Sequence, residues 1–181
     1  MTGRVFAVVG PSGAGKDTLL SGAVAATPAL HWARRVITRP QVAGDEPFEG
    51  VSPQEFDFLR DSGAFALEWP AHGLRYGIRK TEFASLGQGG DVVFNGSRAA
   101  LPLALEQFPN LIVLRISAPS KVLAERLAAR GRETMAEIEA RLARASYAVP
   151  DGMAVIDITN DATPEVGIAR LLAALQAKSV R

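Results

Sequence analysis

The chain contains no cysteine among its 181 residues, so disulfide bonds and thiolate metal sites are excluded and a reducing, cytoplasmic location is expected. Long hydrophobic runs are also missing. The apolar stretch near the N-terminus is too short for a signal peptide, and no stretch approaches the length of a membrane span. The net charge is only +1, which gives no reason to expect a nucleic acid as partner. The remaining composition, 48% hydrophobic and 22% charged, fits one globular domain.

Lysine is scarce as well, with 4 lysines against 16 arginines. Arginine binds phosphate through two parallel hydrogen bonds and keeps its charge, so this excess is compatible with a phosphorylated ligand. A general bias of composition explains it equally well, because the chain is also rich in alanine. The position of each arginine therefore has to decide which of them bind phosphate.

A glycine-rich motif follows the first apolar run. Residues 5–9 are apolar, and residues 10–18 are Gly-Pro-Ser-Gly-Ala-Gly-Lys-Asp-Thr, which predicts a strand, a tight turn and a helix. Such a turn directs successive N–H groups at one anion, and the helix N-terminus adds partial positive charge. We predict an ATP site in which Lys16 reaches the β- and γ-phosphates and takes part in catalysis. The residues assigned to the loop are Gly10, Pro11, Ser12, Gly13, Ala14, Gly15, Lys16, Asp17 and Thr18.

The residue after Gly-Lys departs from the usual motif. Serine or threonine is expected there, with its hydroxyl on Mg²⁺, whereas this chain has Asp17 and then Thr18. A carboxylate is a harder and stronger Mg²⁺ ligand than a hydroxyl. Two explanations stay open. Either Asp17 contacts the metal directly or through water, or Thr18 holds it and Asp17 only favours the helix N-terminus.

Strands alternate with helices along the chain, which predicts an α/β fold with a parallel sheet. We expect strands at 4–9, 33–39, 91–95, 111–117 and 153–158. We expect helices at 15–26, 53–61, between the strands 91–95 and 111–117, and at 120–130, 133–147 and 164–177. Residues 40–53 are predicted as loop, 64–80 as mixed with turns at Pro70 and Gly73, and His31 as part of a loop. Ligands should bind beyond the carboxyl ends of the strands.

The order of several motifs resembles that of the guanylate kinases. The matching segments are the phosphate loop, Ile37-Thr38-Arg39, Glu68-Trp69 with His72-Gly73 and Tyr76-Gly77, Arg126 to Gly131, and Asn160-Asp161. The resemblance covers nearly the whole chain and implies a P-loop nucleoside-monophosphate-kinase-like three-layer fold in one domain, 1–181. Its core would comprise 1–33, 91–125 and 146–181, with an acceptor-binding insertion at about 34–90 and a helical lid at about 126–145.

The acceptor-binding segments differ from those of guanylate kinases. Residues 48–53 lack the expected tyrosine, no glutamate follows Glu68-Trp69-Pro70, and the acidic strand end is replaced by Asn95-Gly96-Ser97. A guanine donor left without an acceptor costs about 1–3 kcal/mol, so this pocket is poorly suited to guanine. Arginines gather in the same region instead, at Arg35, Arg75, Arg79 and Arg98.

With these residues the chain resembles the ribose 1,5-bisphosphate phosphokinases, which are relatives of guanylate kinase that take part in bacterial phosphonate use. The resemblance implies transfer of the ATP γ-phosphoryl group to the 1-phosphate of ribose 1,5-bisphosphate, giving 5-phosphoribosyl 1-diphosphate (PRPP) and ADP, with Mg²⁺ as cofactor. It implies that Arg130 and Arg141 of the lid act in catalysis, and that Arg126 and Asn160 bind ATP. The residues implied to bind the acceptor are Arg35, Arg39, Tyr76, Ser97 and Arg98.

Structural roles remain open for several of these residues. Tyr76 could serve aromatic packing, Ser97 and Arg98 could form a turn at a strand end, and Asn160 could form the turn before the last helix. Arg141 could instead form an exposed pair with Glu137.

Two other functions also stay open: a guanylate or other nucleoside monophosphate kinase, and a non-catalytic guanylate-kinase-like binding module. The expected partners are a phosphorylated sugar and ATP, without a nucleic acid or a membrane. A homodimer is one assembly compatible with the sequence.

Overall fold

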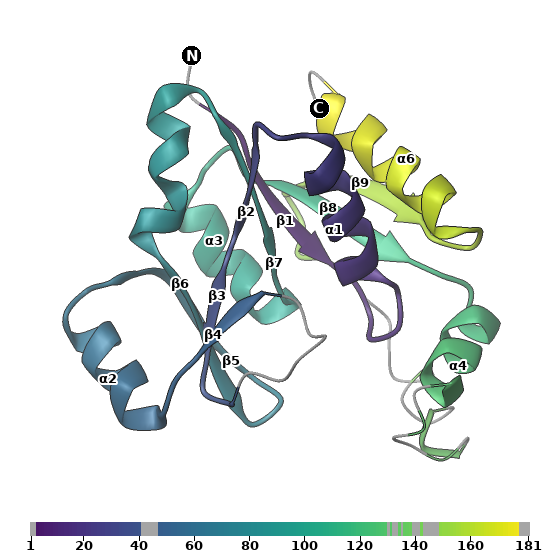
Figure 1. The fold of residues 1–181 in the computed structure, drawn as a ribbon, viewed down its shortest axis with the longest axis horizontal. Helices are drawn as coiled ribbons and strands as arrows, with labels where there is room; N and C mark the ends of the chain where they lie inside the picture. Colours follow the sequence, from purple (N-terminus) through teal and green to yellow (C-terminus); the bar gives the residue numbers. More distant parts are fainter. Residues whose placement is uncertain are drawn as a thin grey trace.

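The computed structural model describes residues 3–40, 47–129, 131, 134, 136–138, 142 and 149–177, and its framework is a five-stranded parallel sheet (Figure 1). The strands lie in the order β2-β7-β1-β8-β9, so the first strand of the chain is in the middle. All four pairings between neighbours are parallel. Their bounds are β1 Val5–Val9, β2 Leu30–Ala33, β7 Asp91–Asn95, β8 Ile112–Ser117 and β9 Ala154–Thr159.

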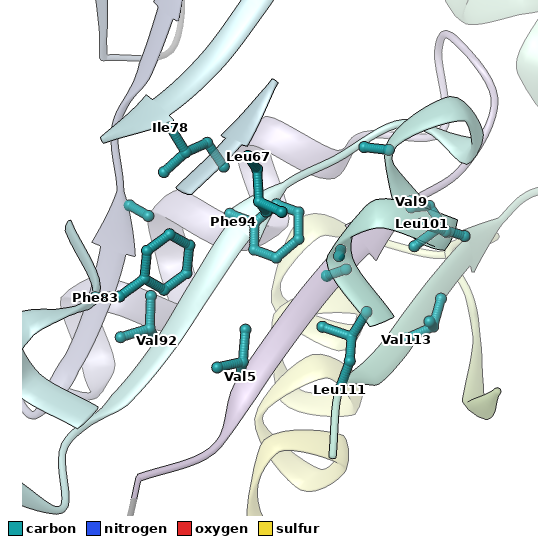
Figure 2. Close-up of a cluster of buried hydrophobic side chains, with 14 of the residues drawn as sticks. Val5, Val9, Leu67, Ile78, Phe83, Val92, Phe94, Leu101, Leu111 and Val113 are labelled. Carbon is teal, nitrogen blue, oxygen red and sulfur yellow. The ribbon is translucent and has the colours of Figure 1, made fainter. Parts of the chain in front are cut away.

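The central strand β1 is buried on both faces, because successive side chains of a strand point to opposite sides. Val5 and Val9 belong to the cluster of buried side chains drawn in Figure 2, together with Phe94 and Leu101. Phe6 and Val8 belong to a second cluster on the other face. Two hydrophobic layers therefore enclose the sheet.

Helices from distant parts of the chain cover these two layers. Helices α1 (Lys16–Ala26) and α6 (Pro164–Gln176) pack against each other on one face (Figure 1). The opposite layer includes side chains of η1 (Lys80–Gln88), η2 (Arg98–Ala100) and α3 (Leu101–Gln107). On α6, Leu171 and Leu175 are buried, and Ile168 and Leu172 pack beside them, as the sequence predicts. The three-layer α/β architecture is confirmed.

A second sheet of four strands lies beside the first and is formed by the predicted insertion. Its order is β4-β3-β6-β5, with β3 parallel to β4 and antiparallel to β6. The bounds are β3 Arg35–Ile37, β4 Phe48–Gly50, β5 Phe65–Ala71 and β6 Leu74–Arg79. Leu67 and Ile78 of this sheet lie beside Phe94 in the hydrophobic cluster (Figure 2), which also includes Trp69, so this sheet is packed onto the core.

Helix α2 (Pro53–Asp61) follows β4 and has a well-defined start. The Ser52 hydroxyl accepts a hydrogen bond from the Glu55 N–H at 3.2 Å, and the Glu55 carboxylate accepts one from the Ser52 N–H at 2.7 Å. This reciprocal cap satisfies two N–H groups that an isolated helix leaves without acceptors, and it lowers the pKa of Glu55. The helix predicted at 53–61 is therefore confirmed.

Helix α4 (Ser120–Ala129) follows β8. The helix predicted at 133–147 lies for the most part outside the described residues. Within the ranges described here, no helix has the length and apolar character needed to cross a bilayer.

Several local predictions in the first half of the chain were wrong. His31 was assigned to a loop but lies in β2, where its Nε2 is 2.7 Å from Glu82 Oε2. The predicted loop 40–53 contains β4. No turn occurs at Pro70, which lies within β5; this strand is at the edge of its sheet, where a missing N–H is tolerated.

The actual turn between β5 and β6 is formed by two residues. Ala71 pairs with Leu74, and between them His72 has φ 52° and Gly73 has φ 72°. Two consecutive positive φ values match the twist of a tight hairpin. The turn expected at Gly73 is thus confirmed, and His72 has a structural role.

Candidate active site

The carboxyl ends of the parallel strands meet at one edge of the sheet, as the sequence predicts. Gly10 follows β1, Asn95 ends β7, and Asn160 follows β9. A Cβ on Gly10 would collide with the carbonyl oxygen of Ile116 in β8, so the chain leaves β1 pressed against the neighbouring strand. This close approach starts the phosphate loop, residues 10–18.

The phosphate loop takes its shape from glycines in left-handed conformations. Gly13 has φ 84° and Gly15 has φ 88°, values that side chains disfavour. The Ala14 N–H donates to the Pro11 carbonyl at 3.2 Å, and the Leu19 N–H donates to the Gly15 carbonyl at 3.0 Å, which starts α1. The first turn of a helix has N–H groups without intrahelical acceptors, and such groups suit a phosphate.

The Lys16 side chain folds back onto the first two residues of this loop. Its Nζ donates to the carbonyl oxygens of Gly10 at 3.0 Å and of Pro11 at 3.1 Å. The ammonium group is thereby held next to the N–H groups of the loop, and both kinds of group favour negative charge. This geometry supports the predicted role of Lys16 at the phosphates.

Asn160 fastens the phosphate loop to the C-terminal part of the chain. The side chain is 4% exposed, and its Nδ2 donates to the Ala14 carbonyl at 2.8 Å. A Cβ on Gly15 would lie 2.5 Å from this Nδ2, and a Cβ on Gly167 of α6 would lie 2.7 Å from the Oδ1. Asn160 is therefore wedged between the loop and α6, while its predicted contact with ATP stays a prediction.

Arg126 of α4 also lies close to the phosphate loop. Its Nη1 lies 3.5 Å from the Gly13 carbonyl oxygen, which brings a guanidinium group next to the predicted phosphate site. Arg130 and Arg141, the predicted catalytic arginines of the lid, lie outside the described residues.

Asp17 and Thr18 are both exposed on the first turn of α1. The carboxylate Oδ1 of Asp17 accepts a hydrogen bond of 2.7 Å from Asn95 Nδ2. No cluster of three or more histidine, cysteine, aspartate or glutamate residues that could hold a metal occurs in the described ranges. One carboxylate and one hydroxyl nevertheless fit Mg²⁺, because this ion keeps several waters and shares phosphate oxygens.

The insertion sheet presents two arginines whose guanidinium groups lie over aromatic rings. Arg35 is 5.2 Å from the ring centroid of Tyr76, and Arg39 is 4.7 Å from that of Phe48. Tyr76 is in turn stacked on Trp69, with centroids 5.5 Å apart and an angle of 8° between the planes. Cation–π attraction holds each guanidinium group against its ring.

Arg75 and Arg79, expected near the pocket, have carboxylate partners within the insertion. Arg75 Nη1 lies 2.9 Å from Asp57 Oδ1, and Arg79 Nη2 lies 2.7 Å from Glu49 Oε1. The Glu49 carboxylate raises the pKa of Arg79 further. These pairs were missed from the sequence because each joins segments well separated in the chain.

Ser97 and Arg98 follow β7 directly. Ser97 precedes η2, and its buried Oγ has no hydrogen-bond partner among the described residues. Arg98 is exposed. A short turn does form here, but it leaves the Ser97 hydroxyl available, so the predicted role of this pair in acceptor binding stays open.

No family model matches the chain. Among solved structures, the guanylate kinase of Anaplasma phagocytophilum superposes with a TM-score of 0.70 at 18% identity, covering 99% of this chain and 89% of that one. The chain therefore has the guanylate-kinase fold.

Sequence relatives define the family more narrowly. Ribose 1,5-bisphosphate phosphokinase PhnN of Ruegeria sp. is 47% identical over 178 residues, which cover 97% of this chain and 93% of the relative. The bifunctional ribose 1,5-bisphosphokinase-thymidine phosphorylase of Azorhizobium caulinodans is also 47% identical and covers 99% of this chain, but the chain spans only 26% of that relative's length. The chain belongs to the ribose 1,5-bisphosphate phosphokinase family.

Proposed function

We propose that the chain transfers the γ-phosphoryl group of ATP to the 1-phosphate of ribose 1,5-bisphosphate, giving PRPP and ADP. Membership of the family supports this activity. The observation that carries the choice of acceptor is the pair Arg35 and Arg39, whose guanidinium groups cover the rings of Tyr76 and Phe48. An acceptor that adds phosphate charge and lacks a base fits such a surface, because guanidinium groups bind phosphate through paired hydrogen bonds.

The carboxylates of the insertion argue against a purine acceptor. Guanine needs acceptors for its N–H groups, and carboxylates supply them in guanylate kinases. Here Glu49 is paired with Arg79, and Asp57 is paired with Arg75. A carboxylate already paired with an arginine is less available as an acceptor for the N–H groups of guanine.

The donor side would be the phosphate loop with Lys16, helped by Arg126 and by Asn160. Asp17 and Thr18 would hold Mg²⁺. When bound, the ion neutralises the β- and γ-phosphate charge. Our assignment of Arg35, Arg39, Tyr76, Ser97 and Arg98 to the acceptor remains part of this proposal.

The reaction needs alignment more than acid–base chemistry. An oxygen of the acceptor 1-phosphate is already ionised and attacks the γ-phosphorus. The new P–O bond forms as the bond from the γ-phosphorus to the β,γ-bridging oxygen breaks, and that oxygen leaves on ADP with the electron pair. No general base is required. Lys16, and the lid residues Arg130 and Arg141, would stabilise the charge of the transferring group.

The proposal is tested by ADP formation with ribose 1,5-bisphosphate and, in parallel, with GMP. We expect turnover with the sugar bisphosphate and a product that ³¹P NMR identifies as PRPP. Faster turnover with GMP would replace the proposal by a nucleoside monophosphate kinase. Absence of Mg·ATP binding in calorimetry would favour the non-catalytic module instead. The cytoplasmic location and the homodimer expected from the sequence stay predictions.

A further inference from the structure

The side chains of Asp17 and Asn95 meet at the edge of the parallel sheet, although 78 positions separate them in the sequence. Asp17 is the second residue of α1, and Asn95 is the last residue of β7. Their hydrogen bond, from Asn95 Nδ2 to Asp17 Oδ1, is 2.7 Å long. Asn95 is 4% exposed, whereas Asp17 is exposed, so the amide supports the carboxylate from the interior.

These two residue types reverse the usual arrangement of P-loop enzymes. There, a serine or threonine after the loop lysine and an aspartate at a strand end hold Mg²⁺ together. In this chain the loop position carries the carboxylate, at Asp17, and the strand end carries an uncharged amide, at Asn95. Both arrangements have one carboxylate, which lies at the strand end in the usual enzymes and after the loop lysine in this chain.

Electrostatic repulsion explains why only one of positions 17 and 95 carries a carboxylate. Two carboxylates at hydrogen-bond distance would repel each other. The amide N–H at position 95 instead donates a hydrogen bond to the Asp17 carboxylate. The hydrogen bond also fixes the direction of the second carboxylate oxygen, Oδ2.

We propose that Asn95 is a positioning residue for Mg²⁺, because it orients the Asp17 carboxylate, and that the pair substitutes for the loop hydroxyl and strand-end aspartate of other P-loop enzymes. The inference rests on the proposed use of ATP. It concerns the metal rather than the acceptor, so it is tested without any acceptor present.

The first experiment moves the carboxylate from position 17 to position 95, which restores the usual arrangement of P-loop enzymes. For each variant, calorimetry gives the ratio of the ATP dissociation constant in EDTA to that in excess Mg²⁺. We expect Asp17→Thr to lower this ratio about tenfold, and the double variant Asp17→Thr with Asn95→Asp to recover most of the loss. As a matched control, Asn110→Asp in the Asp17→Thr background adds the same charge before β8, at the opposite edge of the sheet, and should recover nothing.

The second experiment separates positioning from simple structural support. Asn95→Leu keeps the side-chain volume and removes the donor. We expect it to lower the same ratio about tenfold while the ATP dissociation constant in EDTA stays unchanged. A purely structural role would weaken ATP binding equally in both conditions.

Two results would overturn the inference: a ratio that Asp17→Thr or Asn95→Leu leaves unchanged, or equal recovery by Asn110→Asp and Asn95→Asp. Melting temperatures show whether each variant is folded, and Asn95→Leu decides the outcome alone if the double variant does not fold. Failure of the enzyme to use ribose 1,5-bisphosphate would refute the proposed acceptor but leave these binding ratios interpretable.

Discussion

The donor side and the acceptor side of the site are held together by different means. The phosphate loop is shaped by backbone: two left-handed glycines, Gly13 and Gly15, and main-chain hydrogen bonds set where its N–H groups lie. The insertion sheet positions its cations with side chains, such as Arg35 over Tyr76. A backbone cradle suits any polyphosphate, whereas a surface of side chains can change residue by residue. One fold can therefore keep its donor while its acceptor changes.

The largest effect is expected at Lys16, whose ammonium group lies at the phosphate loop. Lys16→Met should lower kcat/KM for the phosphoryl transfer about 100-fold or more, because it removes a cation from the developing charge. The melting temperature should change little, since the Lys16 ammonium bonds two carbonyl oxygens of the loop and contributes nothing to the hydrophobic clusters. A loss of activity that simply follows loss of folding would contradict this role.

The next prediction tests whether backbone shape controls the donor side. Gly15→Ala should destabilise the protein by about 1–2 kcal/mol, because φ is 88°, and should abolish ATP binding because the new Cβ meets Asn160 Nδ2. Gly152→Ala is the matched control, since Gly152 has φ 83° but open space around it. We expect chemical denaturation to show the strain cost for both variants, with a larger loss for Gly15→Ala because its Cβ also meets Asn160, and calorimetry to show lost ATP binding only for Gly15→Ala. Equal ATP binding by both would contradict the idea.

The acceptor side should respond to side-chain changes without affecting the donor. Arg39→Met should raise KM for ribose 1,5-bisphosphate about tenfold to 100-fold, the range expected for losing a charge-assisted hydrogen bond of about 1.5–3 kcal/mol. The dissociation constant for ATP should not change. Steady-state kinetics with each substrate varied in turn provides the test, and an equal rise in KM for both substrates would show that the two sides are not separable.

The smallest effect is expected for the ion pairs that frame the insertion. Glu49→Gln removes the partner of Arg79, whose side chain is 29% exposed, so we expect a loss of stability below about 1 kcal/mol. The loss should shrink as the salt concentration rises. Denaturant unfolding at low and high ionic strength measures it, and a cost that does not depend on salt would indicate packing instead of charge.

The parts of the fold that the sequence predicted are those with a strong local pattern. The run 5–9, the glycine-rich loop and the amphipathic helix α6 each carry their own signal, and all of them are confirmed. The strand β4 has only three residues and exists because it pairs with β3, a relation that no local pattern records. The turn predicted at Pro70 was wrong because a proline is accepted within a strand that lies at the edge of its sheet. The position of a strand within a sheet depends on its neighbours, which no local pattern records.

The site divides in a similar way. The phosphate loop was predictable because its function is encoded in consecutive residues. The partners of Arg75 and Arg79, and the contact of Asp17 with Asn95, join distant segments and needed the fold. A signal for the last contact was present in the sequence, since an acidic loop residue and a neutral strand end were both unusual, but nothing there indicated that the two anomalies belong together.

Asn160 connects the phosphate loop with helix α6 through close contacts. Because the amide fills the space between Gly15 and Gly167, the loop has no room to shift unless α6 shifts with it. A larger side chain at Gly167, near the start of α6, would therefore displace Asn160 and, through it, the loop that is proposed to bind ATP. Searches for variants with altered ATP affinity should include the C-terminal helix α6, which contributes no residue to the proposed ATP site.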